Sequence, residues 1–383
     1  MFGGHHTHHL HLCPQARRPS VKAYLIRRLL LIIPTFIGIS IITFSILQLS
    51  PGNPVFMRLQ KMQGAMSTGT VSPEIIEQTK KLYGMDKPLP MRYVLWMGRL
   101  VRLDFGNSYK DHRPVLERIK EALPVTLQLN IASLILMYLI AIPVGVYSAT
   151  HPHTRTDNAL TVGLFLLYSL PSFWVAMLLM YFLGGGGGSD SLKELCAAGF
   201  RLIGIEGWFP VQWALQHPLS FQWFPVYGFS TAGSNYWPFR DWLWDRVWHL
   251  ILPVFCLTYA SFAGLSRYTR AGLADVIRQD YIRTARAYGF SERVVVLRYA
   301  LRNALIPIVT LLGALVPAMI GGSVIIESIF SIPGMGRLFY EAILGRDYPM
   351  VMGVFTFTAL LTMAGLIVSD ILYAIVDPRI TFE

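Results

Sequence analysis

Six stretches of this chain are long, apolar and free of charged side chains at their centres. An α-helix rises about 1.5 Å per residue, so about 20 apolar residues cross the roughly 30 Å hydrocarbon core of a bilayer. Inside that core, the backbone must satisfy its hydrogen bonds within helices or a closed barrel. The windows predict transmembrane helices over residues 29–49, about 125–148, 158–183, 247–266, 304–326 and 348–376. The sequence therefore predicts an all-α integral membrane protein with six transmembrane helices.

The overall composition agrees with a membrane protein. Of the 383 residues, 53% are hydrophobic and 14% are charged, whereas a typical soluble domain has about 25% charged residues. The mean hydropathy is +0.46. The net charge of +11 does not indicate nucleic-acid binding, because the basic residues lie in loops between apolar stretches rather than along one soluble face.

Basic residues near the spans predict the orientation of the chain. Arg27 and Arg28 directly precede the first span, and positive flanking charges favour the cytoplasmic side. Counting six spans from there places residues 267–302, with eight arginines and three acidic residues, on the same side. We therefore expect a multi-pass protein of the cell inner (plasma) membrane with both termini in the cytoplasm. Residues 51–121 and 184–246 would then lie on the outer side.

Two segments outside the spans have distinctive compositions. Residues 1–22 form a histidine-rich tail without hydrophobic periodicity, which predicts disorder rather than a metal site. Residues 184–246 begin with a glycine run, and seven of the nine tryptophans lie between Trp208 and Trp248. Because Trp and Tyr favour the membrane–water interface, this insertion is predicted to form an aromatic layer on the outer surface. A lid or a docking surface is the alternative interpretation.

The spans lack the groups on which several membrane functions depend. Ion-coupled carriers usually hold ionisable groups at mid-membrane, whereas Glu327 and Asp370 lie at span ends. No nucleotide-binding or hydrolytic motif occurs in the chain. We therefore predict no catalytic residue, no cofactor and no metal site, and we expect any energy source to lie on another polypeptide. An ion-coupled secondary carrier and a non-transporting membrane scaffold are the alternatives.

The basic segment at residues 267–302 has a pattern that a topology signal does not require. An apolar stripe with spacings of three or four residues predicts a helix through residues 274–288; its members are Ala274, Ile277, Tyr281, Ala285 and Tyr288. Gly289 would end this helix, and Ser291 would cap a second one. We interpret the two helices as an element that fits a groove on a soluble motor protein and transmits its movement. An anchor that only fixes topology is the simpler alternative.

The same segment resembles the cytoplasmic loop of ABC importer permeases, whose pattern is E-A-A-x-x-x-G-x9-I-x-L-P. Ala285, Gly289 and Leu301 match the pattern. Arg283 and Arg302 stand where the pattern has Glu and Pro. The stretches "YLIRRLLLIIPTFIGISIITFSILQLSPGNP", "ESIFSIPGMGRLFYEAILGRDYPMVMG" and "VDPRI" also resemble the first permease subunit of dipeptide, oligopeptide and nickel importers.

The resemblance implies an organisation and a function for the whole chain. Residues 23–121 would hold the first transmembrane helix and a long periplasmic segment, and residues 122–377 would form the ABC transmembrane type-1 core. The chain would form half of the transmembrane pathway of an ATP-driven, binding-protein-dependent importer, with peptides as the implied substrate class. Its partners would be a second homologous permease subunit, two cytoplasmic ATP-binding subunits that hydrolyse ATP, and a periplasmic substrate-binding protein.

The resemblance also implies which residues contact the ATP-binding subunits. The expected coupling residues are Tyr281, Arg283, Thr284, Ala285, Arg286, Gly289, Leu301 and Arg302. Gly289 would permit the turn and Ala285 would allow a close approach. Arg283 and Arg286 would pair with acidic residues of the ATPase.

Overall fold

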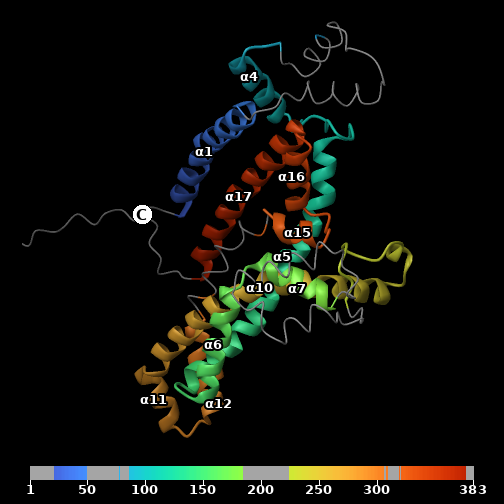
Figure 1. The fold of residues 1–383 in the computed structure, drawn as a ribbon. Helices are drawn as coiled ribbons and strands as arrows, with labels where there is room; N and C mark the ends of the chain where they lie inside the picture. Colours follow the sequence, from blue (N-terminus) through green and yellow to red (C-terminus); the bar gives the residue numbers. More distant parts are fainter. Residues whose placement is uncertain are drawn as a thin grey trace, which may run out of the picture.

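The computed structural model describes residues 21–49, 77, 86–183, 224–305, 308, 319 and 321–376. These residues are mostly helical and contain no β-strand; one isolated antiparallel bridge joins Asn107 to Pro114. The molecule is elongated, with α4 (Leu89–Leu100) near one end and α11 (Asp280–Ala287) at the other (Figure 1). Residues 1–20 of the predicted histidine-rich tail lie outside the described residues, and residues 21 and 22 are the first two of α1 (Val21–Leu49).

Four helices in the described part of the chain are long and apolar enough to cross a membrane. They are α1 (Val21–Leu49), α5 (Val115–Thr150), α10 (Phe239–Ile277) and α17 (Tyr348–Val376). Each of them contains one of the predicted windows, so helices are present where the first, second, fourth and sixth spans are predicted. The fifth window, residues 304–326, lies mostly outside the described residues.

The third predicted span is not one continuous helix. Residues 158–183 are divided between α6 (Arg155–Ser169) and α7 (Ser172–Leu183), which are bent by 98° relative to each other. The break falls at Leu170 and Pro171. Proline has no backbone N–H and favours an extended residue before it, and Leu170 is extended with ψ 131°. The prediction of one helix is wrong because apolar content alone does not reveal a bend.

Helices α5 and α10 are longer than the apolar windows predict. They have 36 and 39 residues, because the helical backbone continues past the first charged side chains. Residues 267–277, predicted as the start of the basic loop, are the last turns of α10. Residues 239–246, predicted as the end of the outer insertion, are its first turns. Residues 184–223 of that insertion lie outside the described residues.

Helices α5 and α10 pack against each other more extensively than any other pair of described helices. At their crossing, a β-carbon on Gly145 of α5 would lie 2.4 Å from Cβ of Thr269 and 2.7 Å from the carbonyl oxygen of Ser266. No side chain larger than that of glycine fits there without moving one helix. Gly145 therefore sets the distance between the two longest helices.

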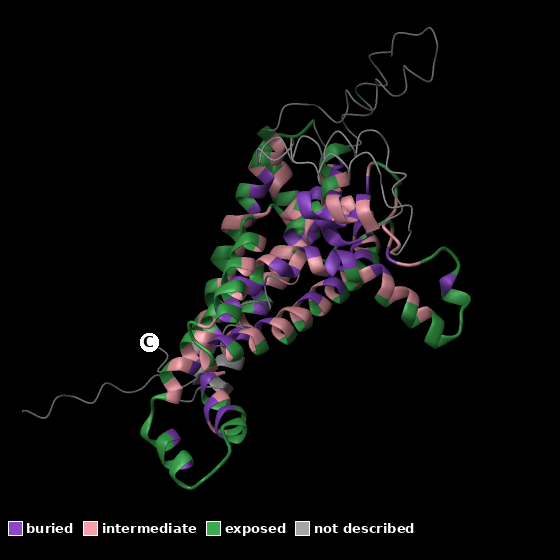
Figure 2. Ribbon diagram, turned by 60° about the horizontal axis from the view of Figure 1, so that its bottom comes forward, coloured by how far each residue is buried: buried purple, intermediate pink, exposed green. Residues whose placement is uncertain are grey.

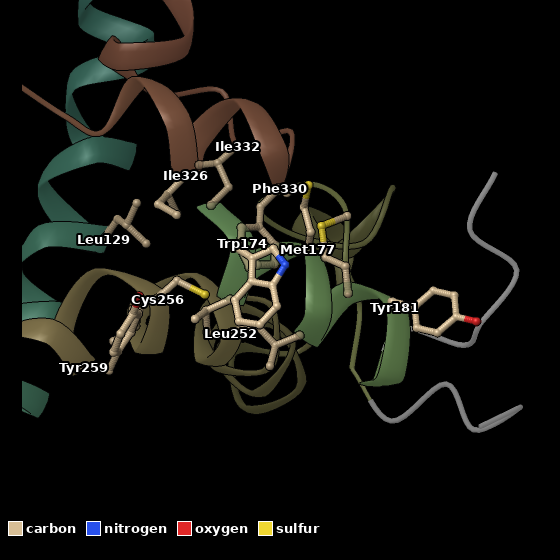
Figure 3. Close-up of a cluster of buried hydrophobic side chains, with 14 of the residues drawn as sticks. Leu129, Trp174, Met177, Tyr181, Leu252, Cys256, Tyr259, Ile326, Phe330 and Ile332 are labelled. Atoms are coloured by element: carbon tan, nitrogen blue, oxygen red, sulfur yellow. The ribbon is translucent and has the colours of Figure 1, made fainter. Parts of the chain in front are cut away.

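Two apolar clusters hold the shorter helices around this pair. The first cluster joins α7 and α10 to α15 (Val324–Ile329), where Trp174, Leu252 and Ile326 are all buried (Figure 3). The second joins the start of α5 to α16 (Met335–Leu344) and α17. Together they pack the α15–α16 segment and the end of the third predicted span onto the two long helices.

Helix α1 lies along α17 on one side of the molecule (Figure 1). Its other side is apolar and exposed, with Leu30 and Ile42 more than half accessible. This is the surface that a lipid-facing helix presents. Arg28 pairs with Asp370 at 3.1 Å, so Asp370, an acid at a span end, has its counter-charge within the chain.

A buried polar network fixes the segment between α15 and α16 onto α5. Glu327 is fully buried, and its carboxylate accepts hydrogen bonds from the Thr126 hydroxyl and from the backbone N–H of Arg337, both at 3.0 Å. The Thr126 hydroxyl in turn accepts a hydrogen bond from the N–H of Met335 at 2.8 Å. From the sequence, Glu327 was only an acid at the end of a span, whereas the structure places it at the centre of this network.

Thr126→Val is expected to destabilise the protein. The substitution removes the donor to Glu327 and the acceptor for Met335, and an unsatisfied buried polar group costs about 1–3 kcal/mol. Denaturant unfolding of the purified protein in detergent measures the loss. Thr126→Ser keeps the hydroxyl and is the control. Equal stability of the Val and Ser variants would show that the network does not support the fold.

Candidate functional site

The candidate coupling segment forms one exposed end of the molecule (Figure 2). After α10 and α11, it comprises α12 (Glu292–Val294), the π-helical segment η2 (Val295–Ala300) and α13 (Leu301–Ala304). Helix α11 packs on η2, and η2 packs on α10. The segment therefore folds back on the helix from which it emerges.

The helix predicted through residues 274–288 is interrupted at Arg278 and Gln279. Gln279 has an extended backbone with ψ 150°, and its carbonyl accepts a hydrogen bond from the N–H of Ile282 at 3.1 Å. The prediction of one helix is wrong because neither glycine nor proline marks the break, and the apolar spacing continues across it. After the break, Ile282 is fully buried, whereas Tyr281 is exposed.

An apolar cluster anchors α11 to the rest of the chain. Ile282 and Ala285 are buried against Leu273 of α10 and against Val295 and Val296 of η2. Ala285 therefore faces its own chain. Its small side chain belongs to the cluster between α11 and η2.

Gly289 makes the turn between the two short helices. Its φ of +79° lies in the left-handed region, which glycine adopts without steric cost. A β-carbon there would meet no atom within 4 Å, so the requirement for glycine is one of backbone conformation alone. Ser291 occupies the predicted N-cap position of α12, but its side chain makes no capping hydrogen bond.

The two arginines expected to contact the ATPase have acidic neighbours in this chain. Arg286 Nε donates to Glu292 Oε1 at 2.6 Å, which links α11 to α12 across the turn. Arg283 Nη1 lies 3.3 Å from Asp280 Oδ1, and both side chains are exposed. Exposed ion pairs contribute little, typically below about 1 kcal/mol, so a partner's carboxylate can replace either acid at low cost.

The remaining predicted residues surround this pair of arginines or brace the segment. The Thr284 hydroxyl donates to the backbone carbonyl of Asp280 at 3.0 Å. The Tyr281 hydroxyl accepts a hydrogen bond from the amide of Asn303 at 2.8 Å, which ties α11 to α13. Leu301 is partly buried and Arg302 is exposed, both in α13.

Exposed aromatic rings lie beside the arginines. Tyr288 is 79% exposed and Phe290 is 46% exposed, and the Phe290 ring lies 5.5 Å from the ring of Tyr299. The sequence pattern placed Tyr288 on the inner stripe and gave no signal for Phe290. Cationic and aromatic groups together suit an acidic, partly apolar protein surface, because such interfaces are enriched in arginine and aromatic residues. Among the described residues, no group of three potential metal ligands accompanies them.

The structure thus defines a multi-pass helical membrane protein with an exposed basic end. The chain belongs to the family of binding-protein-dependent transport system inner membrane components, whose model matches residues 141–382. Residues 21–130 match the N-terminal model of the membrane components of such systems. The resemblance found in the sequence is therefore confirmed, and the membership favours an importer permease over an ion-coupled carrier or a scaffold.

Three relatives illustrate the match. The oligopeptide transport system permease protein AppB of Bacillus subtilis is 38% identical over 94% of this chain and 100% of its own length. The dipeptide transport system permease protein DppB of Escherichia coli K12 is 34% identical over 93% of this chain and 98% of its own. The peptidoglycan transport system permease protein YejB of Agrobacterium fabrum is 32% identical over 94% of this chain and 98% of its own length.

Substitutions at Gly289 are expected to act through the backbone alone. Gly289→Val should reduce the local stability of the α11–η2 segment by about 1–2 kcal/mol, the cost of a left-handed conformation for a residue with a β-carbon. Gly289→Asn should cost less, since asparagine tolerates this conformation. Hydrogen exchange of the amides in this segment measures the difference.

The matched control is Gly264→Ala in α10. Gly264 also has open space around it, but its backbone is helical, so alanine should leave local stability unchanged or increase it. An Asn variant at 289 as unstable as the Val variant would mean that the turn does not depend on its left-handed conformation.

Proposed function

We propose that this permease imports peptides and forms half of the transmembrane pathway of its transporter. Its relatives, oligopeptide and dipeptide permeases aligned over nearly their whole lengths, support this substrate class. The other half would come from a second homologous permease subunit. A periplasmic substrate-binding protein would deliver the peptide, and two cytoplasmic ATP-binding subunits would hydrolyse ATP.

The proposed topology has six transmembrane helices with both termini in the cytoplasm. Four long apolar helices and the bent pair α6–α7 account for five of the six, and residues 304–326 would supply the remaining one. In this topology the outer insertion at residues 184–246 lies in the periplasm. Exposed Tyr236 and Trp244 in its described part support the proposed aromatic layer at the outer surface.

The proposed coupling surface is the exposed face of α11 with the turn at Gly289. This assignment rests on one observation. Helix α11 buries Ile282 and Ala285 in its own chain, whereas its Arg283 side chain is exposed. The inner face fixes α11 to the end of α10, and the outer face remains available to a cytoplasmic subunit. Closure of the ATP-binding subunits would then move α11 together with α10, and the pathway would alternate between two states.

Arg283→Glu is expected to weaken the association of the permease pair with its ATP-binding subunits by about tenfold or more. A like-charge contact at an interface costs several kcal/mol, and Asp280 already lies beside this position. Co-purification and peptide-stimulated ATP hydrolysis of the whole assembly measure the effect.

Arg99→Glu is the matched control, because it reverses an exposed charge on α4, near the opposite end of the molecule (Figure 1). If both variants lose the same amount of association with the ATP-binding subunits, the cause is a general effect of charge rather than a contact at Arg283. Undiminished association of the Arg283→Glu variant would remove this residue from the coupling surface.

Gly289→Asp tests the coupling surface within the working transporter, because it adds a negative charge where this surface is proposed to meet acidic residues of the ATP-binding subunits. The variant should insert into the membrane, since the position is exposed and outside the predicted spans, but it should not transport. Uptake of labelled peptides by cells and the membrane content of the protein are measured together. If the variant keeps its ATP-binding subunits and full substrate-stimulated hydrolysis, the assignment of Gly289 to coupling is wrong.

A further inference from the structure

Helix α10 holds α6 by a polar contact at each end. At the start of α6, Arg270 Nη2 donates to Asp157 Oδ2 at 3.0 Å, and the Asp157 side chain is only 1% exposed. At the other end, the hydroxyl of the fully buried Tyr259 donates to the carbonyl of Leu170 at 2.6 Å. These two contacts, which we call the α6 clamp, join residues that lie 113 and 89 positions apart in the chain.

The spacing of the two contacts requires the helices to lie alongside each other. Tyr259 and Arg270 are separated by about 16 Å along α10, and Asp157 and Leu170 by about 19 Å along α6 and its end, at about 1.5 Å per residue. The order is reversed between the helices, so they run antiparallel. Because two points along its length are fixed, α6 cannot slide or swing against α10 without breaking one contact.

The Asp157 contact is built into the local structure of α6. The Thr154 hydroxyl caps the helix by accepting the N–H of Asp157 at 3.2 Å, and Asp157 Oδ2 also accepts the N–H of His153 at 3.0 Å. Arg270 brings the opposite charge from α10. The Arg270 side chain is 33% exposed, whereas Asp157 is buried, so loss of the contact would leave the Asp157 carboxylate without its opposite charge.

The α10 half of the clamp is continuous with the proposed coupling surface. Only Arg278 and Gln279 separate α10 from α11, and Leu273, one turn after Arg270, packs against Ile282 of α11. Movement of α11 must therefore reach Arg270 directly. Gly145 holds α5 against the same stretch, at Thr269.

The far end of the clamp lies at the bend where α6 and α7 meet at 98°. Beyond the bend, α7 belongs to the apolar cluster with Ile326 and Phe330 rather than to the exposed end (Figure 3). Pro171 leaves the bend without a helical hydrogen bond to resist rotation. The bend is thus the point where α6 can turn relative to α7.

We propose that the α6 clamp makes α6 and the Tyr259–Ile277 part of α10 one rigid body, which turns against α7 at Leu170 and Pro171. Asp157, Arg270 and Tyr259 are positioning residues: they carry the movement of α11 into the third span and touch neither ATP nor peptide. The inference deepens the proposed function of α11 and depends on it.

The test measures how many ATP molecules are hydrolysed for each peptide accumulated. Proteoliposomes contain the complete transporter, and the probe is a tritiated mixture of short peptides from a protein digest. Asp157→Asn, Arg270→Gln and Tyr259→Phe should each keep ATP hydrolysis but lower the uptake per ATP by about fivefold or more, as expected when a coupling between sites is lost. The double variant Asp157→Asn, Arg270→Gln should be no worse than either single variant, because the same contact is lost once.

The control is Arg113→Gln, which removes exposed ion pairs with Glu117 and Glu121 on the predicted outer segment and should leave the ratio unchanged. If the clamp variants accumulate as much peptide per ATP hydrolysed as the wild-type transporter, the proposed role of the α6 clamp is wrong and the proposed function is unaffected. Wild-type vesicles without any ATP-driven uptake would instead overturn the proposed function, and this inference with it.

A second measurement keeps Asp157, Arg270 and Tyr259 unchanged, so its result does not depend on whether the clamp variants fold. Spin labels replace exposed Arg155 on α6, Arg267 on α10 and Phe173 on α7, in a background with the native cysteines changed to alanine. The 155–267 distance should stay constant between the nucleotide-free and ATP-bound transporter, while the 155–173 distance changes. A nucleotide-dependent change in the 155–267 distance would overturn the rigid body.

Discussion

The close approach of α5 and α10 at Gly145 is the constraint on which the rest of the structure depends. With no β-carbon at this position, the α5 backbone lies against Thr269 and Ser266 of α10, and the two longest helices form a continuous frame. The α7 and α15 clusters, the buried Glu327 network and α11 are all attached to one or both of these helices. A larger residue at Gly145 would therefore disturb the core and the exposed basic end together.

Helix α10 connects the parts of the molecule that face different environments. Its first turns lie among exposed aromatic rings such as Trp244, its middle belongs to the buried cluster with Leu252, and its last turns pack against α11 through Leu273. Pro253 lies inside α10 and removes one of its helical hydrogen bonds, so the part that follows it can move relative to the part packed on α7. Under the proposed function, displacement of α11 by ATP-binding subunits would reach the rest of the molecule through α10.

The sequence predicted most long helices but not their bends or their contacts. Apolar windows located α1 and α17 closely, because a bilayer requires about 20 apolar residues for each span. Counting apolar residues could not detect the break at Pro171 or the extension of α10 past Arg267. At the site, the turn at Gly289 was predictable from the residue type. The burial of Ile282 and the pairing of Asp157 with Arg270 were not, since both depend on tertiary packing between segments with no local pattern in common.

The central claim is that this chain is a conduit whose energy comes from ATP hydrolysed on other subunits. The most direct measurement is peptide uptake into proteoliposomes that contain this permease and its second permease, with the binding protein supplied outside and ATP inside. The account predicts accumulation only when both ATP-binding subunits are present and able to hydrolyse ATP. Accumulation against a gradient without those subunits would contradict it.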